Sequence, residues 1–166
     1  METTTPKGAN RMLFMNTLAF TICFAAWMLN GVLVTFLVSN QVFDWGPTEI
    51  GWLLGIPVLT GSIFRLPAGI LTDKFGGKPI YTGILILCAI PMFLLSYVDS
   101  YMAFALCSFG FGLAGVSFSI GIAYTSVWFP KERQGIALGI FGAGNAGAAL
   151  TTLLGPSLLN YFTNYG

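Results

Sequence analysis

Histidine is missing from this sequence and charged side chains are scarce. Asp, Glu, Lys and Arg make up only 8% of the 166 residues, whereas about 25% is usual in a soluble domain. The net charge of +1 and the lack of a basic stripe argue against a nucleic-acid-binding role. No nucleophile–base pair and no metal-ligand cluster can be recognised, so we expect neither an enzyme nor a bound cofactor or metal.

Cysteine is also too rare and too dispersed to form a disulfide framework. Cys23, Cys88 and Cys107 lie far apart, each within an apolar run, and are interpreted as small buried hydrophobic residues. A cleavable signal peptide is not evident either. The polar N-terminus up to Arg11 leads straight into a long apolar segment, which favours an uncleaved membrane anchor.

Long apolar runs fill most of the remaining chain, with 55% hydrophobic residues and a mean hydropathy of +0.80. Five runs each reach the roughly 20 residues that a helix needs to cross a hydrocarbon core. They cover about residues 12–38, 50–71, 79–98, 101–129 and 135–162. Because a membrane β-barrel would need alternating segments of about ten residues, we predict an all-α membrane protein, a multi-span helical bundle. Residues 1–11 are expected to form a tail and residues 12–166 the transmembrane domain.

The basic residues are unevenly distributed about these spans. Six of the seven fall at one end of a five-span bundle: Lys7, Arg11, Lys74, Lys78, Lys131 and Arg133. The other end carries acidic residues: Asp44, Glu49 and Asp99. The positive-inside rule therefore predicts a multi-pass protein of the cell membrane with its N-terminus in the cytoplasm. Five spans would leave the C-terminus outside, where a loop to a sixth helix is expected, so we interpret the chain as a truncated part of a larger bundle.

The link between the second and third spans carries a recognisable pattern, Gly69-Ile-Leu-Thr-Asp73-Lys74-Phe-Gly76-Gly-Lys78. It resembles the loop signature of the major facilitator superfamily, G-x-L-x-D-R/K-x-G-x-R/K, in sequence and in position. The resemblance implies that these residues form a gating loop rather than a substrate site. The glycine at 69 would allow close helix approach, and the one at 76 would permit a tight reversal of the chain.

The fifth run has a small residue at every fourth position. This stripe comprises Gly135, Gly139, Ala143, Gly147, Thr151 and Gly155. We predict that another helix packs closely at four glycines of this region: Gly135, Gly139, Gly142 and Gly147. In lipid, such a helix persists because its backbone must stay hydrogen-bonded. The polar amide of Asn145 on this face either joins helices or faces a cavity.

The stretch SVWFPKERQGIALGIFGAGNAGAA, residues 126–149, resembles the signature of the nitrate/nitrite porter family within that superfamily. The shared features are the W-F-P-x-x-x-Q-G entry and the G-N-x-G core. The resemblance extends through FAAWML in the first span and FRLPAGIL in the second, and so covers nearly the whole chain after about residue 12. It implies the N-terminal half of a secondary transporter for nitrate assimilation, working by alternating access. The implied partners are nitrate or nitrite, the lipid bilayer and a missing C-terminal half, with protons as a candidate coupled ion.

Arg65 is the basic residue that lies inside an apolar run. It precedes Asp73 by eight residues, which at about 1.5 Å per residue puts it roughly 12 Å inside a core of roughly 30 Å. Arginine at that depth costs at least about 2.5–3.5 kcal/mol, and no acid in the sequence lies at a comparable level. A planar oxyanion such as nitrate or nitrite would match the guanidinium fork. An ion pair with an absent second half, or snorkelling to the interface, are the alternatives.

The resemblance also implies the remaining site residues. In the porter family a second-helix arginine at this motif position binds the anion, which assigns Arg65 to the substrate. Phe24 and Phe118 correspond to phenylalanines that pack against the substrate, although lipid-facing or core packing is the ordinary role in a chain with 15 phenylalanines. Asn145 and Gly144 would shape the other wall of the site.

Two other interpretations of the whole chain stay open. A major facilitator carrier for another small organic or inorganic anion predicts that nitrate fails to displace a labelled substrate. A non-transporting, truncated membrane fragment would only pack with partners. The five-span count agrees with the second interpretation for this polypeptide, though not for the family.

Overall fold

The structure is a computed structural model that describes residues 6–164, and helices fill most of this range. Seven α-helices follow one another: α1 Ala9–Ser39, α2 Pro47–Phe75, α3 Gly77–Leu94, α4 Tyr101–Ala114, α5 Ser117–Trp128, α6 Lys131–Gly142 and α7 Ala146–Asn164. Short 3₁₀ turns, η1 Leu95–Tyr97 and η2 Ala143–Asn145, complete them. Together they form five stretches long and apolar enough to cross a membrane. The predicted all-α, five-span bundle is therefore confirmed.

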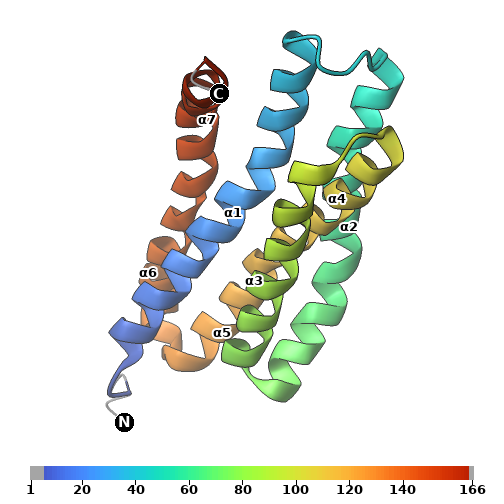
Figure 1. Ribbon diagram of the computed structural model, residues 1–166. Coiled ribbons are helices and arrows are strands. Elements are labelled where there is room, and N and C mark those ends of the chain that lie inside the picture. Colours follow the sequence, from blue (N-terminus) through green and yellow to red (C-terminus); the bar gives the residue numbers. More distant parts are fainter. Residues whose placement is uncertain (1–5, 165–166) are drawn as a thin grey trace.

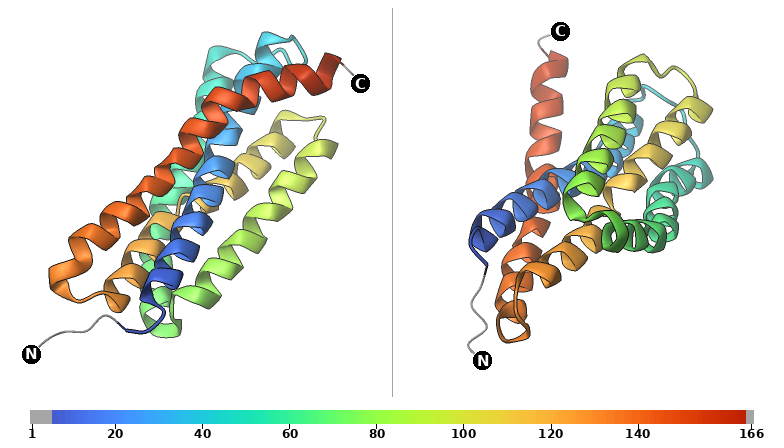
Figure 2. Two further views of the ribbon diagram at one scale, coloured as in Figure 1. Left: turned by 90° about the vertical axis from the view of Figure 1, so that its left-hand side faces the viewer. Right: turned by 90° about the horizontal axis from the view of Figure 1, so that it is seen from below.

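The five stretches run side by side and alternate in direction (Figure 1). Figure 1 places the N-terminus at the lower end of the bundle, together with the α2–α3 and α5–α6 turns, and the C-terminus at the upper end. Among the described residues, α1 packs most extensively against α7, and α2 against α4. Both turned views show α7 next to α1 (Figure 2). All basic residues of the links thus gather at one end, called here the basic end.

Two of the five stretches are interrupted where the sequence predicts continuous helices. The fourth divides into α4 and α5 at Gly115 and Val116, whose backbone N–H groups donate to Gly112 O and Leu113 O at 3.0 and 3.1 Å. These are the tighter i→i−3 bonds of a 3₁₀ turn. The fifth divides at η2. Helix α1 also begins at Ala9, so the last residues of the expected tail are helical.

Proline removes a backbone donor inside α2, and a side chain from another helix replaces it. Pro57 has no N–H to offer the carbonyl of Leu53, four residues earlier. The Nδ2 of Asn30 in α1 donates to this oxygen at 3.0 Å, and Ser108 Oγ of α4 donates to Asn30 Oδ1 at 2.8 Å. Both polar side chains are buried. One buried amide therefore links α1, α2 and α4.

The end of α5 is completed in the same way. Pro130 leaves the carbonyl of Ser126 without its helical donor. Gln134 Nε2 donates to Ser126 O at 2.8 Å and to Phe129 O at 3.1 Å. The glutamine of the W-F-P-x-x-x-Q-G entry therefore fastens the start of α6 to the end of α5.

Within the described residues, the glycines of the every-fourth-residue stripe pack against α1 in α7 and not in α6. A Cβ added at Gly144 or Gly147 would collide with Phe20 or the backbone of Thr21 in α1. A Cβ at Gly135, Gly139 or Gly142 would meet nothing within 4 Å in the part of the chain that the structure describes. Within these residues Gly147 packs closely, whereas Gly135, Gly139 and Gly142 are open, and close packing at these three stays a prediction. A stripe of every fourth residue drifts by about 40° at each step around a helix of 3.6 residues per turn, so Gly139 lies opposite the face that buries Ala137, Phe141 and Gly144.

The glycines of the predicted gating loop also differ from one another in conformation and packing. Gly76, between α2 and α3, has φ 85°, a conformation that suits glycine and permits the tight reversal. Gly69 has no neighbour within 4 Å of an added Cβ among residues 6–164, so the close approach expected there is absent from this part of the molecule. The neighbouring Gly77 is instead the glycine that packs closely, against Tyr124 of α5.

Candidate functional site

Arg65 lies in the middle of α2 with its side chain exposed at the surface of the described bundle. Its guanidinium carbon lies 6.0 Å from the centroid of the Phe118 ring in α5. That distance is at the outer limit of a cation–π contact. Within residues 6–164 no ion pair or hydrogen bond to Arg65 is formed. Arg65 is therefore a cation held beside an aromatic ring with its donors open.

Five aromatic residues form a connected cluster beside Arg65. They are Phe20, Phe24 and Trp27 of α1, Phe118 of α5 and Phe141 of α6. The Phe20 centroid lies 4.6 Å from Phe24, 5.7 Å from Phe118 and 4.6 Å from Phe141. Phe24 in turn lies 5.2 Å from Trp27. Phe20 is fully buried at the centre, and this aromatic cluster joins the two predicted phenylalanines without direct contact between them.

Phe24 and Phe118 are each half-buried, which is what a wall residue needs. Each ring rests on Phe20 and still keeps an accessible part. The indole nitrogen of Trp27 is buried and has no hydrogen-bond partner among the described residues. The cluster thus combines packed aromatic rings with one N–H donor, that of Trp27, which has no acceptor in this part of the chain.

Gly144 and Asn145 lie in η2, on the side of α1 that carries Phe20. Gly144 is buried, and a Cβ there would touch the Phe20 ring. Asn145 is exposed, and its Nδ2 donates to Gly142 O at 2.9 Å. Phe20 therefore lies against three predicted residues, Phe24, Phe118 and Gly144. Phe118 in turn connects this group to Arg65. Asn145 is adjacent to them in the chain, and its amide is held by its own turn.

The predicted gating-loop residues lie at the basic end. Asp73, Lys74, Gly76 and Lys78 are all exposed there. Lys74 Nζ lies 5.4 Å from the Phe75 ring. No ion pair of Asp73 is formed within the described range. The loop is far along α2 from Arg65 and makes no contribution to the aromatic cluster.

Sequence reasoning missed Phe20 and Phe141, which hold the cluster together. The signal for Phe20 was available, because Phe20, Phe24 and Trp27 are spaced four and three residues apart and so share one face of a helix. Phe141 gave no such signal. Its role depends on α6 crossing beside α5, where a Cβ at Gly121 would collide with its ring.

The arrangement is suited to holding a small anion rather than to catalysis. A guanidinium offers several N–H donors in a plane, and such charge-assisted bonds are roughly twice as strong as neutral ones. The Phe118 ring lies on one side of this group. Among the described residues no group of three potential metal ligands occurs.

Comparison with known proteins gives two concordant findings. The family described as Major Facilitator Superfamily matches residues 15–165. The probable nitrate/nitrite antiporter NarK1 of Thermus thermophilus is 46% identical over 149 residues, which is 90% of this chain and 33% of that protein. The nitrite extrusion protein of Bacillus subtilis is 36% identical over 146 residues, 87% of this chain and 36% of that protein. The probable nitrate transporter NarT of Staphylococcus epidermidis is 35% identical over 152 residues, 92% of this chain and 38% of that protein. The chain thus spans about a third of the length of these curated relatives.

Proposed function

Since this chain belongs to the Major Facilitator Superfamily, we propose that it is part of a carrier that moves nitrate or nitrite across the cell membrane. The names of the three relatives above support this substrate class. The lipid bilayer surrounds the five apolar stretches, and the basic end faces the cytoplasm. The rest of the carrier supplies the other side of the substrate site.

Arg65 is the anion clamp in this proposal. The observation that carries it is an arginine in the middle of α2 that lies 6.0 Å from the Phe118 ring and forms no ion pair within residues 6–164. An arginine inside a membrane normally pairs with a partner, because its charge is costly there. Nitrate or nitrite supplies that partner during transport, while Phe24 and Phe118 wall the site.

Alternating access would use the surfaces that this part of the molecule leaves uncovered. Gly135, Gly139 and Gly142 have open space beside them in the described bundle, so a second half could approach the backbone there. The loop with Asp73 and Lys74 at the basic end would act as the gate. No carboxylate pairs with Arg65 in the described residues.

The test is nitrate binding and uptake by the full-length protein carrying Arg65→Lys, in proteoliposomes with labelled nitrate. Lysine keeps the charge but loses the planar fork, so nitrate affinity should fall by about tenfold or more, equivalent to about 1.4 kcal/mol. Arg133→Lys, at the basic end, is the matched control and should leave affinity unchanged. Unaltered nitrate affinity in Arg65→Lys would refute the clamp.

Competition in the same assay separates the substrate classes. Unlabelled nitrate and nitrite should displace the label, whereas chloride should not, because a guanidinium fork binds a pair of oxygens and chloride has none. Equal displacement by all three anions would indicate a carrier for another anion.

A further inference from the structure

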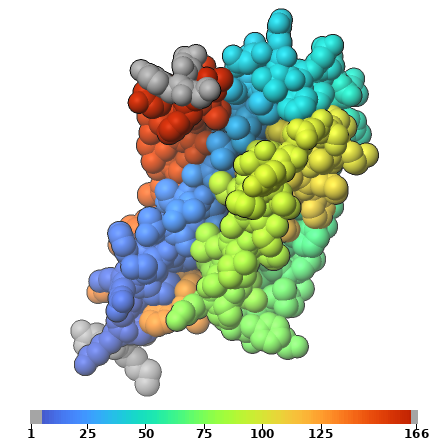
Figure 3. Space-filling model, in the orientation of Figure 1, coloured from blue at the N-terminus to red at the C-terminus, as the bar shows by residue number. Residues whose placement is uncertain are grey.

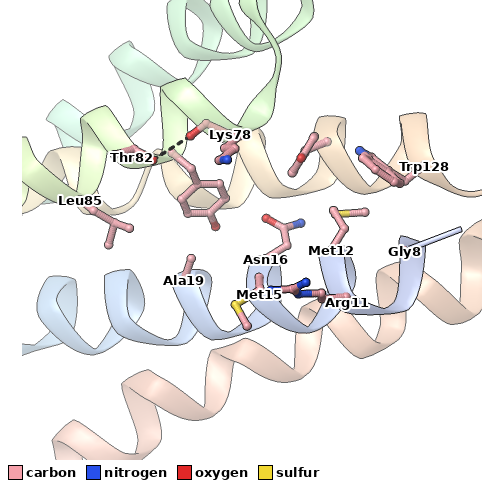
Figure 4. Close-up of a pocket in the computed structure, with 12 residues that line it drawn as sticks. Gly8, Arg11, Met12, Met15, Asn16, Ala19, Lys78, Thr82, Leu85 and Trp128 are labelled. Atoms are coloured by element: carbon pink, nitrogen blue, oxygen red, sulfur yellow. Dashed lines mark hydrogen bonds between the residues drawn. The ribbon is translucent and has the colours of Figure 1, made fainter.

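A cavity lies away from Arg65, at the basic end between α1, α3 and α5. It measures about 600 Å³. In the space-filling view the lower parts of α1 and α3 diverge, and atoms coloured as α5 and α6 fill the gap between them (Figure 3). Figure 4 shows the lining side chains projecting from these helices into one space. No part of the aromatic cluster lines it.

A buried amide at the inner wall has an unused acceptor. Asn16 of α1 is only 4% exposed. Its Nδ2 donates to Gly121 O at 3.0 Å and to Thr125 Oγ1 at 2.8 Å, both in α5. Its Oδ1 is buried without a hydrogen-bond partner among the described residues. Because a buried unpaired acceptor is costly, a donor from outside the described chain is needed.

Two cations stand on different walls of the cavity. Arg11 comes from the first turns of α1, and Lys78 from the start of α3 (Figure 4). Neither forms an ion pair within the described range, 6–164. Tyr124 and Trp128 line the same region, as amphipathic rings do at a membrane interface. The mouth therefore has the charge and the ring chemistry of a headgroup site.

The wall further from the basic end is apolar. Met15, Ala19 and Leu85 line it. Ala19 follows Arg11 by eight residues, so the apolar part reaches about 12 Å further into the membrane. This length suits the upper part of an acyl chain, which needs no polar partner.

We propose that this cavity binds one anionic glycerophospholipid, of the phosphatidylglycerol type. Its phosphate lies between Arg11 and Lys78, and an acyl chain follows Met15, Ala19 and Leu85. Asn16 Oδ1 then accepts from a water enclosed beneath the phosphate. Basic pockets between transmembrane helices are suited to such headgroups. The proposal does not depend on nitrate being the substrate.

The test counts lipid retained by the chain purified from nanodiscs of phosphatidylcholine and phosphatidylglycerol, measured by mass spectrometry. The double variant Arg11→Gln/Lys78→Gln should retain about tenfold less phosphatidylglycerol, since each cation contributes several-fold. The matched control Lys131→Gln/Arg133→Gln removes the same charge from the same end and should change retention less than twofold. Leu85→Trp, which fills the apolar part and keeps all charges, should also release the lipid.

Two outcomes would overturn the proposal. Equal losses in the two double variants would show general attraction of anionic lipid to the basic end. No loss in any variant would show that the cavity holds no lipid, for example because another segment of the full-length protein covers it.

Discussion

Asn30 shows how a single residue can hold a membrane bundle together. Hydrophobic attraction between helices is weak in lipid, so packing and interhelical hydrogen bonds carry more of the association. Asn30 Nδ2 donates to the Leu53 carbonyl, which Pro57 leaves without a helical donor, and Asn30 Oδ1 accepts from Ser108 Oγ. Pro57 can therefore bend or loosen α2 without leaving the Leu53 carbonyl unpaired.

Replacing Asn30 should therefore destabilise the bundle more than replacing its partner. Asn30→Leu leaves the Leu53 carbonyl and the Ser108 hydroxyl unpaired and should lower the free energy of unfolding by about 1–3 kcal/mol. Ser108→Ala removes one bond and leaves the link to Leu53, so its loss should be about 0.5–1.5 kcal/mol. Denaturant titration in detergent, followed by circular dichroism, measures both. A smaller loss in Asn30→Leu than in Ser108→Ala would contradict this account.

Among the helices, the fifth stretch shows most clearly how its glycines differ in packing. The η2 turn separates α6, whose glycines are open in the described residues, from α7, whose glycines touch α1. Thr151 Oγ1 adds a bond to Ala25 O at 3.2 Å along the same contact. Position around the helix thus decides which glycines of this stretch pack inside the described chain.

Alanine at two glycines of this stretch should have opposite effects on stability. Gly147→Ala places a methyl group against the backbone of Thr21, which cannot move aside, and should cost about 1–3 kcal/mol. Gly139→Ala meets nothing in the described bundle and should be neutral or stabilising by up to about 1 kcal/mol, because alanine favours the helix. Thermal unfolding of the chain in detergent compares the two. A destabilised Gly139→Ala with an unaffected Gly147→Ala would show that Gly139, and not Gly147, lies in the packed contact.

Viewed whole, the molecule has an apolar flank and two polar ends of opposite charge. Large side chains such as Phe14, Leu66 and Val127 are 62%, 73% and 79% exposed, which suits contact with lipid or with further helices. The α2–α3 and α5–α6 links with their lysines and arginines meet at the end where the chain begins (Figure 1). This separation of charge is the physical basis for the proposed orientation.

Labelling of single cysteines should report that orientation. In a variant without the three native cysteines, Asp99→Cys should react with a membrane-impermeant maleimide added to intact cells, whereas Lys131→Cys should react only after lysis. The native cysteines Cys23, Cys88 and Cys107 are buried, so their replacement by alanine leaves the ends unchanged. Reaction of Lys131→Cys in intact cells would show that the basic end faces outward, opposite to the proposed orientation.

The sequence by itself determined the properties that depend on short stretches of chain. Span number follows from the length of apolar runs, the polar ends follow from where charges interrupt them, and the depth of Arg65 follows from its distance to Asp73. The reversal at Gly76 was predicted for the same reason, since a tight turn is a local matter. Family membership was predicted from contiguous motifs.

Only the tertiary structure decided which surfaces meet. Phe141 joins the aromatic cluster because α6 crosses beside α5, and Gly147 rather than Gly139 contacts α1 because the packed face of the fifth stretch includes only Gly147. The cavity lined by Arg11, Lys78 and Asn16 likewise forms from helices far apart in the chain. The physical reason is that an apolar helix in lipid has no solvent-facing side to mark its partner face. Hydrophobic periodicity then says little about which face of a helix is packed, and the packing of individual side chains determines the partner face.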